Sequence, residues 1–149
     1  MKMIFAIATL LLAQSVFAGV SAYSGKSGQK LFIEEGDKGA FFVKFTGVKS
    51  PWENKVIKTE RTGKEEKYRY SFGYKLELSN GVHDRTYTMI TEARSTLVAG
   101  SIVEQISLYT PENSNDGVTL TWDKELTEKS QGLKLSDEHK KKPFTPEVP

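Results

Sequence analysis

One stretch of the chain alternates without a break between apolar and polar positions: Tyr68-Arg69-Tyr70-Ser71-Phe72-Gly73-Tyr74-Lys75-Leu76-Glu77-Leu78. The aromatic and aliphatic residues fall on one face and the polar residues on the other, which is the two-residue period of a β-strand. A strand with one apolar and one polar face is typical of an antiparallel sheet that packs on one side. This stretch therefore predicts an antiparallel β fold.

Turn residues on both sides of this strand predict hairpins. Asn80-Gly81 tolerates positive φ at both positions and is a strong two-residue turn signal. In the register that pairs Ser79 with Val82, Tyr74 faces Tyr87, Phe72 faces Met89, and Arg69 faces Glu92 on the outer side. Before the strand, Arg61-Thr62-Gly63 predicts a three-residue loop that pairs Glu60 with Lys64, because the two-residue alternative sets like charges opposite each other.

The same reasoning extends along the chain and predicts about seven strands, at residues 31–34, 40–46, 52–60, 64–78, 82–94, 101–109 and 118–123. In the last pair, Leu108 opposite Val118 places Ile106 opposite Leu120. No segment predicts a convincing amphipathic helix. We therefore expect an all-β fold with one domain at 30–126, either an antiparallel β-sandwich or a small up-and-down barrel, since both use the same alternation.

The N-terminus predicts export. Lys2 is followed by an apolar run at residues 4–13, and Val16 and Ala18 give the small-x-small spacing of a cleavage site. The run is too short to span a bilayer, which takes about 20 residues. We expect a signal peptide at 1–18 cleaved after Ala18, with cleavage after Ala22 as the second choice. The short leader resembles those of bacteria, so we expect a periplasmic or secreted protein.

Composition limits the remaining possibilities. The chain has no cysteine and therefore no disulfide. Its 21 basic and 19 acidic residues give no reason to expect nucleic acid as a partner. Neither face of 82–94 is continuously apolar, so we expect no membrane span. We expect residues 19–29 to be flexible and residues 127–149, rich in lysine and proline, to form a disordered or loosely docked tail.

No motif predicts catalysis, a cofactor or a metal site. His83 and Asp84 are adjacent in a predicted strand and point to opposite faces, so they are not expected to act as a dyad. Glu112, Ser114, Asp116, Gly117 and Asp123 match the spacing of a calcium loop, but strands flank them where helices are required. We expect no catalytic, metal-ligating or cofactor-binding residues.

The aromatic face is the most informative surface for function. We expect a non-catalytic binding module of the cell envelope, whose partner is an envelope protein or a small apolar or aromatic ligand. The candidate ligand-binding residues are Trp52, Tyr68, Tyr70, Phe72, Tyr74, Tyr87 and Met89. The face is also consistent with an ordinary β-core. Alternatives are a lipocalin-like carrier with an internal cavity and an envelope-polymer hydrolase that uses unidentified carboxylates. The sequence does not indicate the oligomeric state.

Overall fold

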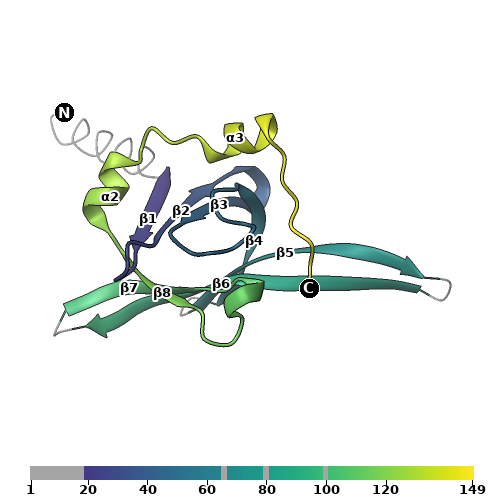
Figure 1. Cartoon of the computed structure of the whole chain (residues 1–149), viewed down its shortest axis with the longest axis horizontal. Helices are drawn as coiled ribbons and strands as arrows, with labels where there is room; N and C mark the ends of the chain where they lie inside the picture. The colour runs from purple at the N-terminus through teal and green to yellow at the C-terminus, as the bar shows by residue number, and fades with distance from the viewer. Residues whose placement is uncertain (1–18, 65–66, 79–80, 99–100) are drawn as a thin grey trace, which may run out of the picture.

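Eight antiparallel strands close into a barrel in sequence order, in a computed structural model that describes residues 19–64, 67–78, 81–98 and 101–149 (Figure 1). The strands are β1 (Val20–Ser24), β2 (Lys30–Glu35), β3 (Ala40–Thr46), β4 (Ile57–Lys64), β5 (Lys67–Leu78), β6 (Gly81–Val98), β7 (Ser101–Leu108) and β8 (Val118–Trp122). Two short 3-10 helices, η1 (Asp37–Gly39) and η2 (Pro111–Asn113), lie in loops. The all-β prediction is confirmed, and of the two architectures the chain adopts the barrel.

The first strand lies in the segment that we expected to be flexible. β1 pairs with β2 along its whole length and with β8 through Tyr23↔Trp122 and Ser24↔Thr121. Val20, Ala22 and Tyr23 are buried. The short alternation of Val20-Ser21-Ala22-Tyr23 among glycines and serines is a weak signal alone, and barrel closure with β8 stabilises it. The domain therefore begins at β1 and not at residue 30.

The loop predicted at Arg61-Thr62-Gly63 is wrong, because β4 continues through it to Lys64. The observed pairs include Arg61↔Tyr70, Gly63↔Tyr68 and Lys64↔Lys67. Gly63 has a φ of 125°, and a Cβ there would lie 2.4 Å from the carbonyl oxygen of Lys67. Gly63 thus allows the backbones of β4 and β5 to approach closely within the hairpin, and it is not a turn residue. The like charges at Lys64 and Lys67 are tolerated at this solvent-exposed end.

The predicted register of the next hairpin is also wrong, and a β-bulge explains part of the difference. Near the turn, Leu78 pairs with Gly81, so that Phe72 lies opposite Tyr87 and Tyr74 opposite Arg85. The register shifts between Tyr70 and Ser71, which leaves Met89 as an extra residue on β6. Met89 and Ile90 are consecutive, yet both are 0% exposed. The bulge therefore buries two neighbouring side chains and changes which residues of β6 face inward beyond it.

Residues beyond the barrel form a two-stranded ribbon. The β4 ladder with β5 ends at Ser71, and the β7 ladder with β6 begins at Ile90. The remaining parts of β5 and β6 pair only with each other and project from the barrel (Figure 1). The β7–β8 pairs Leu108↔Val118 and Ile106↔Leu120 confirm the predicted register of that hairpin.

Residues 47–56 form a loop that closes one end of the barrel, where the sequence favoured a strand at 52–60. Trp52 is 6% exposed and packs against Phe72 and Tyr87, with ring centroids 5.4 and 5.2 Å apart. Asn54 has a φ of 62° and donates its backbone N–H to the carbonyl of Phe45 at 2.8 Å. A left-handed residue ends extended structure here, and only Ile57 and its successors enter β4.

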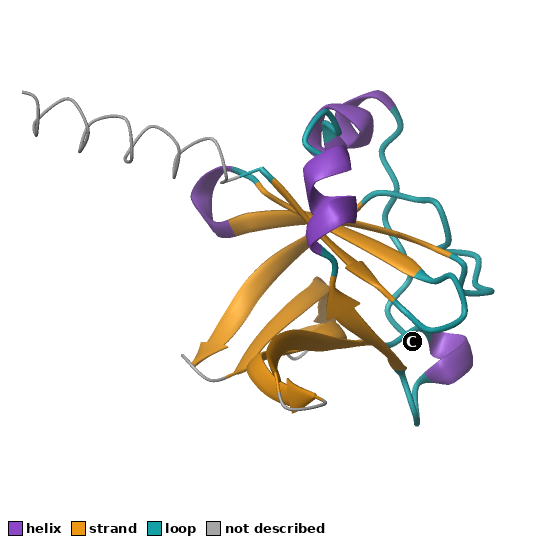
Figure 2. Ribbon diagram, turned by 90° about the vertical axis from the view of Figure 1, so that its left-hand side faces the viewer, coloured by secondary structure: helices purple, strands orange, loops and turns teal. Residues whose placement is uncertain are grey.

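The C-terminal segment is folded onto the barrel, not disordered, and contains helices that the sequence did not predict (Figure 2). In α2 (Lys124–Lys129), the Asp123 carboxylate accepts the N–H of Leu126, a bond that lowers the pKa of Asp123. The Thr127 hydroxyl accepts the N–H of Ala22 at 2.9 Å. The helix thereby lies against β1.

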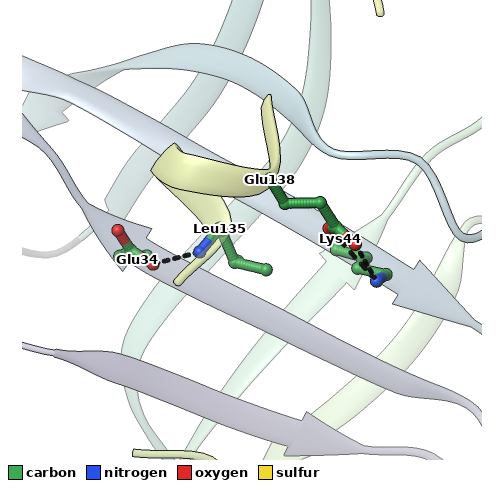
Figure 3. Close-up of polar contacts among 4 residues, drawn as sticks. All are labelled: Glu34, Lys44, Leu135 and Glu138. Carbon is green, nitrogen blue, oxygen red and sulfur yellow. Dashed lines mark hydrogen bonds and ion pairs between the residues drawn. The ribbon is translucent and has the colours of Figure 1, made fainter. Parts of the chain in front are cut away.

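A second helix, α3 (Leu135–Lys141), docks on β2 and β3 (Figure 3). Glu34 accepts the N–H of Leu135 at 2.6 Å, so a carboxylate lies at the positive end of the helix. Lys44 forms an ion pair with Glu138 at 3.0 Å. Leu135 is 1% exposed and packs on Phe42. These contacts are few and join residues far apart in the sequence, so the composition of residues 127–149 did not predict them.

Among the described residues, no helix has the length and apolar character needed to cross a membrane.

Candidate functional site

The predicted aromatic residues lie inside or around the barrel core. Trp52, Tyr70 and Met89 are buried in one cluster, and Tyr68, Phe72 and Tyr87 pack against it partly buried. Tyr74 lies on β5 in the ribbon, and its side chain is outside the described part of the chain. An eight-stranded barrel has an interior just wide enough for side chains to fill. Packing within the core therefore accounts for most of these residues.

Among the described residues, one buried polar group of this core has no hydrogen-bond partner. The Tyr87 hydroxyl is buried and has no hydrogen bond among the described residues. Its ring contacts Trp52 at 5.2 Å and Phe72 at 5.5 Å. Burial, together with the negative charge of Glu112, raises the pKa of Tyr87 to about 12. The rings of Trp52, Phe72 and Tyr87 at the aromatic end of the barrel are thus held by packing against one another.

The opposite end holds a buried carboxylate. Glu92 on β6 is 6% exposed. Its oxygens accept hydrogen bonds from the hydroxyls of Tyr70 at 3.1 Å and Tyr23 at 3.3 Å. The guanidinium of Arg61 lies 3.5 Å from one carboxylate oxygen and stacks on the ring of Tyr68 at 3.6 Å from its centroid. Three residues from three different strands, Tyr23, Arg61 and Tyr70, hold this carboxylate in one orientation.

Burial and the negative charge of Glu92 change the pKa values of Tyr23 and Tyr70. Desolvation raises the pKa of Tyr23 and Tyr70 above their ordinary value, and the charge of Glu92 raises it further. Arg61 acts in the opposite direction on Tyr70. Both phenols therefore stay protonated and donate hydrogen bonds across the neutral pH range.

A small pocket of about 160 Å³ opens at this end of the barrel. The charged residues of its described lining are Glu35, Glu92, Glu104 and Arg61. Ligand pockets for drug-sized molecules have volumes of about 300–1,000 Å³, so this pocket accepts only a small group. We name it the polar pocket.

Sequence reasoning missed the polar pocket because of the bulge at Met89. Strict alternation from Tyr87 and Met89 predicts that Glu92 faces outward, opposite Arg69. Beyond the bulge the phase changes, so Glu92 lies opposite Tyr68 and faces inward, while Arg69 lies opposite Thr91. Tyr23 was missed because it belongs to the unpredicted β1. No local signal in the sequence marks either residue.

A second concave surface lies on the outer side of strands β4 to β8. One row of residues crosses five strands in register: Thr62, Arg69, Thr91, Ser107 and Thr119. The inward neighbours Ile106 and Leu120 are buried, so this row faces outward. At about 4.8 Å between strands, the row spans roughly 19 Å.

A groove of about 670 Å³ follows this row, and we name it the outer groove. Lys64, Lys67 and Arg69 line it together with hydroxyl groups and the amide of Gln105. Among its described lining residues only Glu92 is acidic, and its carboxylate faces the barrel interior. The groove therefore presents cations and hydrogen-bonding groups to solvent.

In the part of the chain that the structure describes, no group of three His, Cys, Asp or Glu side chains is arranged to hold a metal ion. Asp123, the last position of the calcium-like spacing, caps α2 instead. The His83 side chain lies outside the described part, and its backbone pairs with Leu76.

Comparisons with known proteins found no matching family model, no curated protein with a significantly similar sequence and no significantly similar solved structure.

Proposed function

We propose that the chain is an exported, non-catalytic binding module of the cell envelope that binds an acidic polysaccharide through the outer groove. The observation that carries the proposal is the in-register row of four hydroxyl residues and one arginine across β4 to β8. Adjacent strands hold these groups at a fixed spacing, so the surface is organised before a partner arrives. The signal peptide predicted at 1–18 supports an envelope location.

The chemistry of the groove favours a charged sugar polymer over an apolar ligand. Hydroxyl and amide groups match the hydroxyls of a sugar chain, and Lys64, Lys67 and Arg69 match its acidic substituents. Glu65 and Glu66 separate the two lysines in the sequence, so their charges oppose binding and keep it weak. Trp52, Tyr68, Tyr70, Phe72 and Tyr87, which the sequence favoured for ligand contact, lie in the core or pack against it.

Binding to two matched polymers tests this proposal. Dextran sulfate is expected to bind in low salt, and uncharged dextran is expected to bind much more weakly. Raising the salt concentration from 0.15 M to 1 M shortens the screening length from about 8 Å to about 3 Å and is expected to abolish most of the binding. Equal binding of the two dextrans would overturn the role of charge, and tighter binding of poly-glutamate would overturn the preference for a polysaccharide.

Substitutions locate the binding surface. Arg69→Gln is expected to weaken dextran sulfate binding about two- to fivefold, equivalent to ~0.4–1 kcal/mol for an exposed ion pair. Lys49→Gln removes an exposed cation outside the groove and is the matched control. Replacing Glu65 and Glu66 with Gln is expected to strengthen binding. Equal losses in Arg69→Gln and Lys49→Gln would place binding elsewhere.

A further inference from the structure

The wall of the polar pocket includes the first residue after the predicted leader. Gly19 lines this pocket together with Ser21 and Tyr23. These residues alternate along the chain with Val20 and Ala22, which are buried, and the backbone of Ala22 is hydrogen-bonded to Thr127 of α2. Gly19 therefore lies on the inner side of the barrel, next to a cluster of carboxylates.

The described lining around Gly19 carries more acidic residues than basic ones. Its acidic residues are Glu35, Glu92 and Glu104, and its basic residue is Arg61. Arg61 is already paired with Glu92 at 3.5 Å and stacked on Tyr68. The polar pocket is small, at about 160 Å³, and an opposite charge within about 4–6 Å favours the charged form of a group.

We infer that cleavage after Ala18 frees an α-ammonium group at Gly19 that binds in the polar pocket as a cationic partner of its carboxylates. This inference rests on the predicted leader and is independent of the proposed function of the outer groove. Hydrolysis of the Ala18–Gly19 peptide bond by water leaves a carboxylate on Ala18 and an amine on Gly19, which is protonated at neutral pH. Before cleavage the same nitrogen is an uncharged amide. Processing therefore adds one positive charge at this wall.

The location of this charge gives it a structural role. β1 closes the barrel through Tyr23↔Trp122 and Ser24↔Thr121. An ion pair at the first residue before β1 holds the free end of that strand in place. The mature N-terminus is thus expected to be fixed, whereas chain ends are usually mobile.

The structure also discriminates between the two predicted cleavage sites. Cleavage after Ala22 would remove Val20, Ser21 and Ala22 from β1. Val20 is 2% exposed and Ala22 is 0% exposed, and Ala22 carries the hydrogen bond to Thr127. Cleavage after Ala18 leaves all of β1 intact.

The experiment compares two forms of the chain that begin at Gly19, one with a free amine and one N-acetylated. In the free form, NMR titration is expected to give an α-amino pKa above the ordinary 7.7–8.0. Below the pKa of the unfolded chain the free form is expected to have the higher thermal unfolding temperature. That advantage is lost as the pH rises through the elevated folded pKa. An ordinary pKa and equal stability of the two forms would overturn the inference.

Two matched variants test whether a shift in the α-amino pKa of Gly19 is caused by the polar pocket. Glu35→Gln removes an exposed carboxylate of the lining and is expected to lower the α-amino pKa. Glu128→Gln removes an exposed carboxylate on α2, outside the pocket, and is expected to leave it unchanged. Equal shifts in both variants would contradict the inference. Mass spectrometry of the exported protein is expected to show Gly19 as its first residue, and Tyr23 in that place would overturn it. Neither result depends on polysaccharide binding.

Discussion

The two ends of the barrel are filled by opposite chemistries, although β5 and β6 run through both. At one end Trp52 packs on Phe72 and Tyr87 by ring contacts. At the other, hydroxyl groups and a guanidinium surround the Glu92 carboxylate. Apolar packing depends on shape and is insensitive to pH, whereas the polar end depends on which groups carry protons. We therefore expect the aromatic end to contribute more to folding stability, and the polar end to contribute more to the pH dependence of that stability.

The largest expected effect is at the aromatic end. Trp52→Ala removes a buried indole and leaves a cavity, so the free energy of unfolding is expected to fall by about 3–5 kcal/mol. Urea unfolding followed by far-UV circular dichroism measures it. Trp122→Ala is the control, because Trp122 is 40% exposed and its loss is expected to cost less than half as much. Equal losses would contradict the assignment of Trp52 as the closing residue.

At the polar end, Glu92→Gln is expected to lower the free energy of unfolding by about 1–3 kcal/mol. The amide keeps one acceptor for the tyrosine hydroxyls but loses the charge that pairs with Arg61. The same urea titration measures it, with Glu128→Gln as an exposed carboxylate control expected within about 0.5 kcal/mol of the unsubstituted chain. A larger loss in Glu92→Gln than in Trp52→Ala would reverse the comparison.

The next largest effect on stability is expected at alkaline pH, which acts mainly on the tyrosines of the polar end. Burial raises the folded pKa of Tyr23 and Tyr70 above the value of the unfolded chain. The unfolded chain releases these protons from about pH 10, while the folded chain retains them. Stability is therefore full below pH 10 and falls as the pH rises above it. Unfolding temperatures measured between pH 9 and 11 check this, and a flat profile above pH 10 would contradict it.

The smallest expected effect on stability comes from replacing a tyrosine by phenylalanine, made once at each end of the barrel. Tyr70→Phe removes a hydrogen bond to Glu92 and is expected to cost about 0.5–1.5 kcal/mol. Tyr87→Phe removes a buried hydroxyl that has no partner among the described residues, and is expected to be neutral or slightly stabilising. Paired urea titrations measure the difference. A larger loss in Tyr87→Phe would indicate a hydrogen bond at the aromatic end.

Local patterns predicted the strands well but not their phase. β3 coincides with the predicted range 40–46, and the alternation of residues 68–78 lies within β5. The register already differs from the prediction at the turn, where Leu78 pairs with Gly81, and the phase changes at Met89, where the bulge buries two adjacent apolar side chains and no turn residue marks it. Glu92 and the outer groove depend on that phase, so the sequence did not reveal them. β1 and α3 were missed because partners distant in the sequence, β8 and Glu34, hold them in place.

Closure of the barrel between its first and last strands has a consequence for the time course of folding. Tyr23 pairs with Trp122, a separation of 99 residues (122 − 23). Pairings between residues so far apart form slowly, because most of the chain must be ordered before they are favourable. If the leader directs export, β1 is the first strand to emerge and β8 the last. The first strand then has no partner in β8 until residues 118–122 are available, so the barrel can close only after nearly the whole chain has emerged.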